Sequence, residues 1–83
     1  MVVTGHVQGV FFRESTRREA RARDVAGWVR NRGDGAVEAV FEGGPEDVEA
    51  LVAFCSRGPR GAEVANVEAT PEPPDGLRGF EVR

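Results

Sequence analysis

The sequence predicts a two-layer α+β domain in which two helices cover one sheet. Three observations lead to this fold class. The chain has 83 residues, which is enough for one small hydrophobic core. Its strand and helix patterns follow the order β-α-β-β-α-β, with a further strand at the end. An Asp-Gly pair lies between the second and third strands, where it is typical of a hairpin turn.

The first part of the chain is expected to form a strand, a loop and a helix. Residues 1–4 are a short apolar strand candidate, and two glycines in the following six residues indicate a loop. A helix follows from Phe11 or Phe12, because Arg, Glu and Ala favour helices. Its apolar stripe is weak and would place Arg23 on the core side. Asp24 is expected to end the helix, since Asp tolerates a left-handed backbone.

The middle of the chain is expected to form a hairpin and a second helix. Strand candidates at 25–30 and 36–42 flank the turn at 33–35, and the second strand alternates apolar and polar side chains. Pro45 suits the first turn of the second helix, and the Gly-Pro pair at 58–59 ends it. Four residues at helical spacing give this helix a stripe that faces the core: Val48, Leu51, Val52 and Cys55.

Two more strands complete the pattern. Residues 64–70 alternate, with Val67 and Ala69 on one face, and residues 77–82 follow a proline-rich turn. A split β-α-β repeat of this kind forms a ferredoxin-like sandwich, an antiparallel sheet with two helices on one face. Residues 1–83 are expected to form one such domain. The fold alone indicates no function, because many unrelated activities share it.

Composition excludes several classes of protein. Cys55 is the only cysteine, so the chain can form neither an internal disulfide nor a CxxC zinc site. The single histidine further weakens the case for a metal. No apolar run reaches the roughly 18 residues that a membrane helix needs, and the N-terminus does not resemble a signal peptide. We therefore expect a cytoplasmic protein that uses no metal or other cofactor and no membrane.

The charge is unevenly distributed along the chain. All 11 basic residues are Arg, and the formal net charge is −3. Residues 1–32 carry seven Arg and three acids, whereas residues 33–83 carry four Arg and eleven acids. A basic section within an acidic protein indicates a small anionic ligand, because a nucleic acid generally needs a broad basic face. We expect a monomer without a nucleic-acid partner.

A nucleic-acid-binding module is the competing class. Residues 78–82 read RGFEV, which faintly resembles the R-G-F-x-F-V core of RNA-recognition domains. This similarity lies on the last strand and lacks the aromatic residues that should follow. It also places Glu81 where a base would stack, which argues against the module.

Two segments are candidate sites. In residues 5–13 a strand leads into a glycine-containing loop and then a helix, with Arg13 in the first turn. Such a loop can direct its N–H groups, the positive end of a helix and a guanidinium at a phosphate. An ordinary tight connection with a surface arginine would have the same spacing. Asn31 ends the next strand, where it either caps a turn or faces a ligand in the loop, because the two strands are expected to be neighbours.

Both segments match signatures of the acylphosphatase family. Residues 5–13 read GHVQGVFFR, and the signature is G-x-V-Q-G-V-x-F-R. Residues 27–37 read GWVRNRGDGAV, and the signature is G-W-x-x-N-x-x-x-G-x-V. The chain resembles this family over nearly its whole length, through the RGP at 57–59 and the GFEV at 79–82 as well.

The resemblance implies hydrolysis of acyl phosphates to a carboxylate and inorganic phosphate, with water as the direct nucleophile and without a metal or a covalent intermediate. The matching residues would be Arg13, which holds the phosphate, and Asn31, which orients the attacking water. Backbone amides of the loop would complete the phosphate site: Gln8, Gly9, Val10, Phe11 and Phe12. Physical chemistry agrees, because a carboxylate leaves readily and the reaction needs charge stabilisation and a placed water.

The resemblance also leaves one alternative and shows some departures. Hydrogenase-maturation proteins contain a similar domain, so a carrier that binds carbamoyl phosphate without turnover stays open. Family members usually have several residues before the position of Met1, so the first strand is expected to be short and to lose pairing in the sheet centre. Arg23 stands where relatives usually carry an apolar residue, which predicts a less tightly packed first helix.

Overall fold

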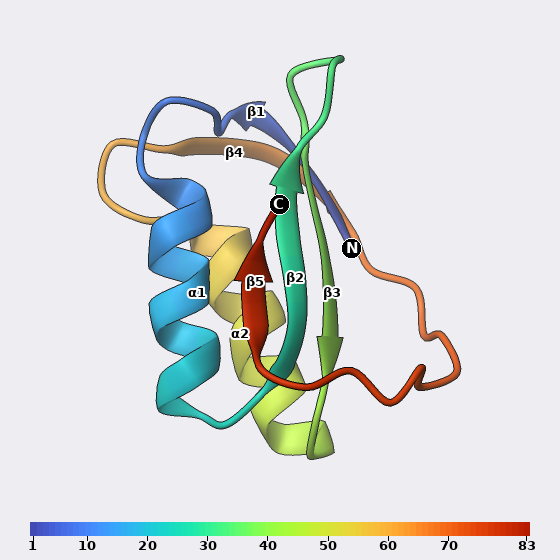
Figure 1. The fold of residues 1–83 in the computed structure, drawn as a ribbon. Helices are drawn as coiled ribbons and strands as arrows, with labels where there is room; N and C mark the ends of the chain where they lie inside the picture. The colour runs from blue at the N-terminus through green and yellow to red at the C-terminus, as the bar shows by residue number, and fades with distance from the viewer.

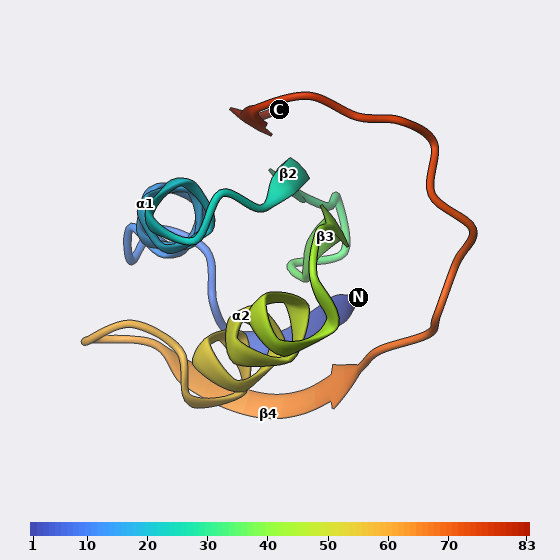
Figure 2. The ribbon, with the colours of Figure 1, turned by 90° about the horizontal axis from the view of Figure 1, so that it is seen from below.

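The computed structural model describes all of residues 1–83 and has two layers, a five-stranded sheet and two helices (Figure 1). Both helices lie on the concave side of the curved sheet, as an end-on view shows (Figure 2). This arrangement confirms the ferredoxin-like α+β prediction. The elements in chain order are β1 (Val2–His6), α1 (Phe12–Ala22), β2 (Ala26–Asn31), β3 (Val37–Glu42), α2 (Pro45–Arg57), β4 (Glu63–Glu68) and β5 (Phe80–Val82).

The sheet is mixed, so the expectation of a purely antiparallel sheet is wrong for one pair of strands. The strand order is β4-β1-β3-β2-β5, and β5 runs parallel to β2, with Phe80 opposite Gly27 and Val82 opposite Val29. The reason lies in the connection. Residues 69–79 carry the chain from β4, at one edge of the sheet, across to the opposite edge (Figure 2). Strand β2 runs antiparallel to β4, and β5 arrives in the opposite direction to β4 as well. The two strands β2 and β5 are therefore parallel to each other.

Strand β1 extends to His6, beyond the predicted end at residue 4, and pairs unevenly with its two neighbours. It pairs with β4 over five residues but with β3 at only two positions, Val2 opposite Glu38 and Val3 opposite Val37. Met1 adds to the β3 side, since its ammonium group donates to the Ala39 carbonyl oxygen and its own carbonyl accepts from the Ala39 N–H, both at 2.9 Å. Pairing in the sheet centre is therefore limited to the first three residues.

A bulge in the β1–β4 pair changes which β4 residues face the core. The register shifts between Thr4 and Gly5, so one extra residue of β4 is left over at Ala65. As a result Val64 and Val67, three positions apart, both pack against the core. Simple alternation had predicted Val67 and Ala69, and Ala69 is exposed beyond the end of the strand. A period-two pattern cannot reveal a bulge.

The two helices meet in the core through their buried stripes. Phe12, Thr16 and Ala20 are buried on α1, and Leu51 and Cys55 are buried on α2. The Thr16 hydroxyl donates to the Phe12 carbonyl oxygen at 2.8 Å and lies 3.8 Å from the Cys55 sulfur. Burial raises the pKa of the Cys55 thiol to about 11, against a smaller lowering by the Thr16 contact. Cys55 is a core residue, as predicted.

Helix α1 ends at Ala22, two residues before Asp24, which has the expected left-handed conformation with φ 56°. Arg23 does not face the core. Its guanidinium is exposed and lies 3.8 Å from a Glu19 carboxylate oxygen and 3.5 Å from one of Asp47 on α2. The helical stripe would have carried Arg23 inward, but the helix stops first.

Candidate active site

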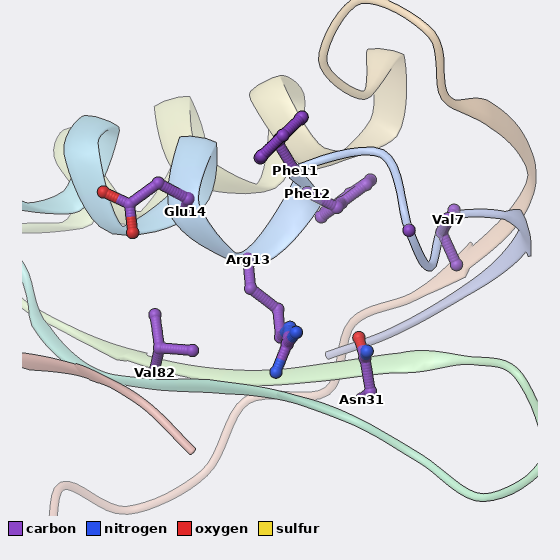
Figure 3. Close-up of a pocket in the computed structure, with 8 residues that line it drawn as sticks. Val7, Phe11, Phe12, Arg13, Glu14, Asn31 and Val82 are labelled. Atoms are coloured by element: carbon purple, nitrogen blue, oxygen red, sulfur yellow. The ribbon is translucent and has the colours of Figure 1, made fainter.

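A cavity of about 300 Å³ lies where the start of α1 faces the ends of β2 and β5 (Figure 3). Five of the seven site residues suggested by the sequence line it, and Gln8 and Val10 do not. A second cavity, of about 530 Å³, lies between β3, α2 and residues 69–73 and contains none of these residues. The residues that line the first cavity are Val7, Gly9, Phe11, Phe12, Arg13, Glu14, Asn31 and Val82.

The expectation that the Asn31 strand lies beside the strand leading into the loop is wrong. Strand β3 separates β2 from β1. The loop and the end of β2 are instead connected by the Gln8 side chain, whose amide donates to the Arg32 carbonyl oxygen at 2.8 Å and to the Ala36 carbonyl oxygen at 3.0 Å. This contact brings the loop to the β2–β3 hairpin and hence to Asn31.

Sequence reasoning gave Gln8 only a backbone role and missed its side chain. The available signal was the family signature itself, which fixes a glutamine at this position. A backbone N–H group that binds phosphate needs no particular side chain, so a fixed side chain indicates a contact of its own. In the structure that contact gives a second donor to two hairpin carbonyl groups, each of which also accepts a backbone hydrogen bond.

The loop before α1 presents a row of unpaired donors. The backbone N–H groups of Gln8, Gly9, Val10 and Phe11 donate to no backbone or side-chain acceptor of the protein. Gly9 and Phe11 have positive φ angles of 75° and 57°, which turn the backbone sharply around the cavity. The first N–H groups of α1 follow directly and lack intrahelical acceptors. Such a concave set of N–H groups at a helix N-terminus favours an anion.

Arg13 and Asn31 lie at this cavity with free polar groups. Both are half-buried, and neither side chain forms a hydrogen bond or an ion pair with the protein. Arg13 extends from α1 toward the sheet, and the Asn31 amide stands beside it at the end of β2 (Figure 3). A half-buried guanidinium without a partner is costly to desolvate, so this site is suited to an anionic ligand.

Glu14 also lines the cavity, and its charge is balanced by neighbouring arginines. Its carboxylate accepts a hydrogen bond from Arg17 at 2.5 Å and lies 3.6 Å from the Arg18 guanidinium. The hydrogen bond from Arg17 lowers the pKa of Glu14, against a smaller opposing effect of desolvation. Glu14 is therefore ionised at neutral pH and cannot donate a proton to a leaving group.

Other candidate chemistry lies away from the cavity. His6 is exposed near the end of β1 and does not line the cavity. No group of three or more His, Cys, Asp or Glu side chains is placed to hold a metal ion. None of the helices combines the length and the apolar character required to cross a bilayer.

Comparison with known proteins decides the family. The family model for acylphosphatase matches residues 1–82. The chain belongs to the acylphosphatase family. Similar sequences include the acylphosphatase of Haloarcula marismortui, 56% identical over 98% of this chain and 89% of that protein. The acylphosphatase of Rubrobacter xylanophilus is 57% identical over 98% of this chain and 74% of that protein.

Solved structures agree with the family assignment. The crystal structure of the Bacillus subtilis acylphosphatase matches with a TM-score of 0.94 and 35% identity, over 99% of this chain and 92% of that one. A match to HypF of Thermococcus kodakarensis has a TM-score of 0.83 and 34% identity, and it covers all of this chain but 12% of HypF. The family assignment supports hydrolysis of acyl phosphates, which is the activity that the sequence predicted.

Proposed function

We propose that residues 1–83 form one catalytic domain that hydrolyses acyl phosphates by direct attack of water on phosphorus, in the cavity between α1 and the ends of β2 and β5. One observation carries this mechanism. The unpartnered side chains of Arg13 and Asn31 share one cavity with Gly9 and Phe11, two members of the row of free loop N–H groups. An anion receptor and a separate polar amide are the two components that the reaction requires.

The phosphoryl group is proposed to bind to the loop and to Arg13. Its oxygens accept hydrogen bonds from the N–H groups of Gln8 to Phe12, and the Arg13 guanidinium contacts two of them at once. These donors are held in place before the substrate arrives, because the Gln8 side chain fixes the loop to the hairpin. Charge on the phosphoryl oxygens is therefore stabilised without reorganisation during the reaction.

Asn31 is proposed to place the attacking water. Its amide oxygen accepts a hydrogen bond from the water, and its amide nitrogen donates to a phosphoryl oxygen only as negative charge develops there in the transition state. The water oxygen forms a bond to phosphorus while the bond to the acyl oxygen breaks, and the electron pair of that bond leaves with the carboxylate. The proton of the water passes to the phosphate product. A carboxylate is a stable leaving group, so the ionised Glu14 is not required as an acid.

The test is turnover of benzoyl phosphate in excess EDTA, with inorganic phosphate as a competitive inhibitor. In Arg13→Ala we expect a higher KM, weaker phosphate inhibition and a lower kcat, because Arg13 contacts the phosphoryl group before and during the reaction. Arg78→Ala is the matched control, since Arg78 is exposed, has no ion-pair partner and lies in the connection to β5. Activity that disappears with EDTA and returns with a divalent ion would contradict the mechanism.

The carrier alternative has one supporting observation, the match to a small part of the HypF chain. A carrier would bind an acyl phosphate and release it unchanged. Measuring phosphate release and substrate binding on the same sample distinguishes the two functions. Turnover with release of inorganic phosphate supports the enzyme, and binding without release supports the carrier.

We further propose that the protein acts as a cytoplasmic monomer and binds no nucleic acid. The only exposed large apolar side chains, Phe11 and Val82, both line the first cavity, so no fully exposed large apolar side chain lies elsewhere to favour self-association. The net charge of −3 disfavours a polyanion. The single cysteine is a free, buried thiol, as is common in a reducing compartment. Sedimentation analysis tests the oligomeric state directly.

A further inference from the structure

The second cavity, of about 530 Å³, lies in line with β1 and interrupts the sheet. Figure 2 shows the start of β1 between β3 and the end of β4, with α2 beside it. Beyond that point β3 continues to Glu42 and the chain continues from β4 through residues 69–73, and both line the cavity without a strand between them. The cavity therefore has the place that one further length of extended chain would take in the sheet.

Backbone hydrogen-bonding groups are free on both sides of this cavity. Ala39 exchanges both of its backbone hydrogen bonds with Met1, at 2.9 Å each. Residues two apart on an antiparallel strand direct these groups to the same side, so Phe41 directs its N–H and C=O groups toward β1, which has no residue opposite it. On the other side Thr70 lies two residues beyond Glu68, the last β4 residue paired with β1, and forms no backbone hydrogen bond. An extended peptide placed there would pair with both sides.

The walls of the second cavity indicate which peptide would fit. Its helix side is apolar, because Val48 and Val52 of α2 line it and both are half-buried. The charged side chains among its lining residues are all carboxylates, those of Glu42, Glu49 and Glu72, and no arginine lines it. Neither Glu49 nor Glu72 has an ion-pair partner. Successive residues of a strand point to opposite faces, so a peptide of alternating apolar and basic residues matches both the apolar wall and the acidic surroundings.

We propose that the second cavity is a docking site for an extended segment of a partner protein, with alternating apolar and basic residues, that pairs as a strand between β3 and residues 69–73. Main-chain hydrogen bonds to Phe41 and Thr70 supply affinity, and the apolar wall and the carboxylates supply selectivity. The site is independent of the function proposed above, because the two cavities share no residue. Peptide binding is therefore expected to leave hydrolysis unchanged.

The test is titration of the protein with the capped pentapeptide Val-Arg-Val-Arg-Val, followed by calorimetry and by amide hydrogen exchange in NMR spectra. We expect saturable binding and exchange of the Phe41 and Thr70 N–H groups that is slower by about tenfold or more, because both groups become hydrogen-bonded. The same peptide with an N-methyl group on its central valine should bind about two- to tenfold more weakly, which is the effect of losing one backbone hydrogen bond.

Controls separate charge, location and strand pairing. The peptide Val-Glu-Val-Glu-Val should bind more weakly than the arginine peptide, and Glu72→Arg should weaken binding of the arginine peptide by about two- to fivefold, as expected for exposed charge pairs. Glu63→Arg is the matched control and should bind as the wild type does, since Glu63 is exposed on β4 and lines neither cavity. Absence of saturable binding, equal affinity for the N-methylated peptide, or binding without protection of Phe41 and Thr70 would overturn the proposal. A dimer that the peptide dissociates would overturn it in favour of a second copy of this chain as the occupant.

Discussion

Replacing Asn31 with alanine should slow the reaction without weakening phosphate binding. The Asn31 side chain is half-buried at the cavity and forms no hydrogen bond within the protein. Its removal therefore leaves no protein group without a partner. The backbone of Asn31 stays paired opposite Val37 in the β2–β3 ladder. On this basis we expect the free energy of unfolding to change by less than about 1 kcal/mol.

The catalytic effect should be much larger than the effect on stability. Loss of one preorganised donor to a developing charge lowers kcat by about 10²-fold or more, equivalent to about 2.7 kcal/mol in the activation free energy. In the proposed mechanism inorganic phosphate contacts the loop and Arg13, which the substitution leaves unchanged, so its inhibition constant should stay within about twofold. The assay is benzoyl phosphate hydrolysis at saturating substrate, with circular dichroism and phosphate titration on the same sample.

Asn66→Ala is the matched control for this prediction. Asn66 is the only other asparagine in the chain and lies exposed on β4, away from the cavity. Its kcat should equal that of the wild type. A folded Asn31→Ala protein with near-normal kcat would remove Asn31 from the mechanism. A loss of kcat with an equal loss of phosphate affinity would make Asn31 a binding residue instead.

Three further predictions concern the loop, the core and the cap of α1. Gln8→Ala should lower the free energy of unfolding by about 1–3 kcal/mol, because it removes two hydrogen bonds that hold the loop to the hairpin, and it should raise the phosphate inhibition constant. Denaturant titration and inhibition assays measure these two effects. Because the Cys55 pKa is raised from 9.0 to about 11, the unfolded thiol ionises first, so stability should fall as pH rises from about 9 to 11, by about 2–3 kcal/mol. That fall should be absent from the pH profile of Cys55→Ala. Phe11→Gly should be more stable than Phe11→Ala by about 0.5–1 kcal/mol in thermal unfolding, because only glycine relieves the left-handed strain; equal melting temperatures would contradict this.

The sequence predicted the fold class because local patterns and turn residues agree with each other along the chain. The hairpin turn, Pro45 at the start of α2 and Asp24 at the end of α1 all have the predicted roles. Errors occur where the structure depends on long-range geometry. The bulge that turns Val64 and Val67 to the same side arises from pairing with β1, and the parallel direction of β5 arises from the path of residues 69–79. Neither leaves a signal in local periodicity.

The candidate site shows the same division. The two family signatures identified the seven candidate site residues, and five of them line one cavity in the structure. The signatures did not show how the loop and Asn31 come together. Strand β3 lies between β1 and β2, and the side chain of Gln8 connects the loop to the hairpin. The partner-free state of Arg13, in a helix whose other arginines have partners, is likewise visible only in three dimensions.

Phe11 shows why the family signature can leave a position of the loop open to different side chains. The loop imposes a left-handed backbone there whatever the side chain is, since the row of free N–H groups depends on that turn. In the proposed mechanism the backbone of this residue binds the phosphate, and its side chain is not required for binding. The Phe11 side chain is 83% exposed and forms no capping hydrogen bond, in agreement with a position that needs only its backbone.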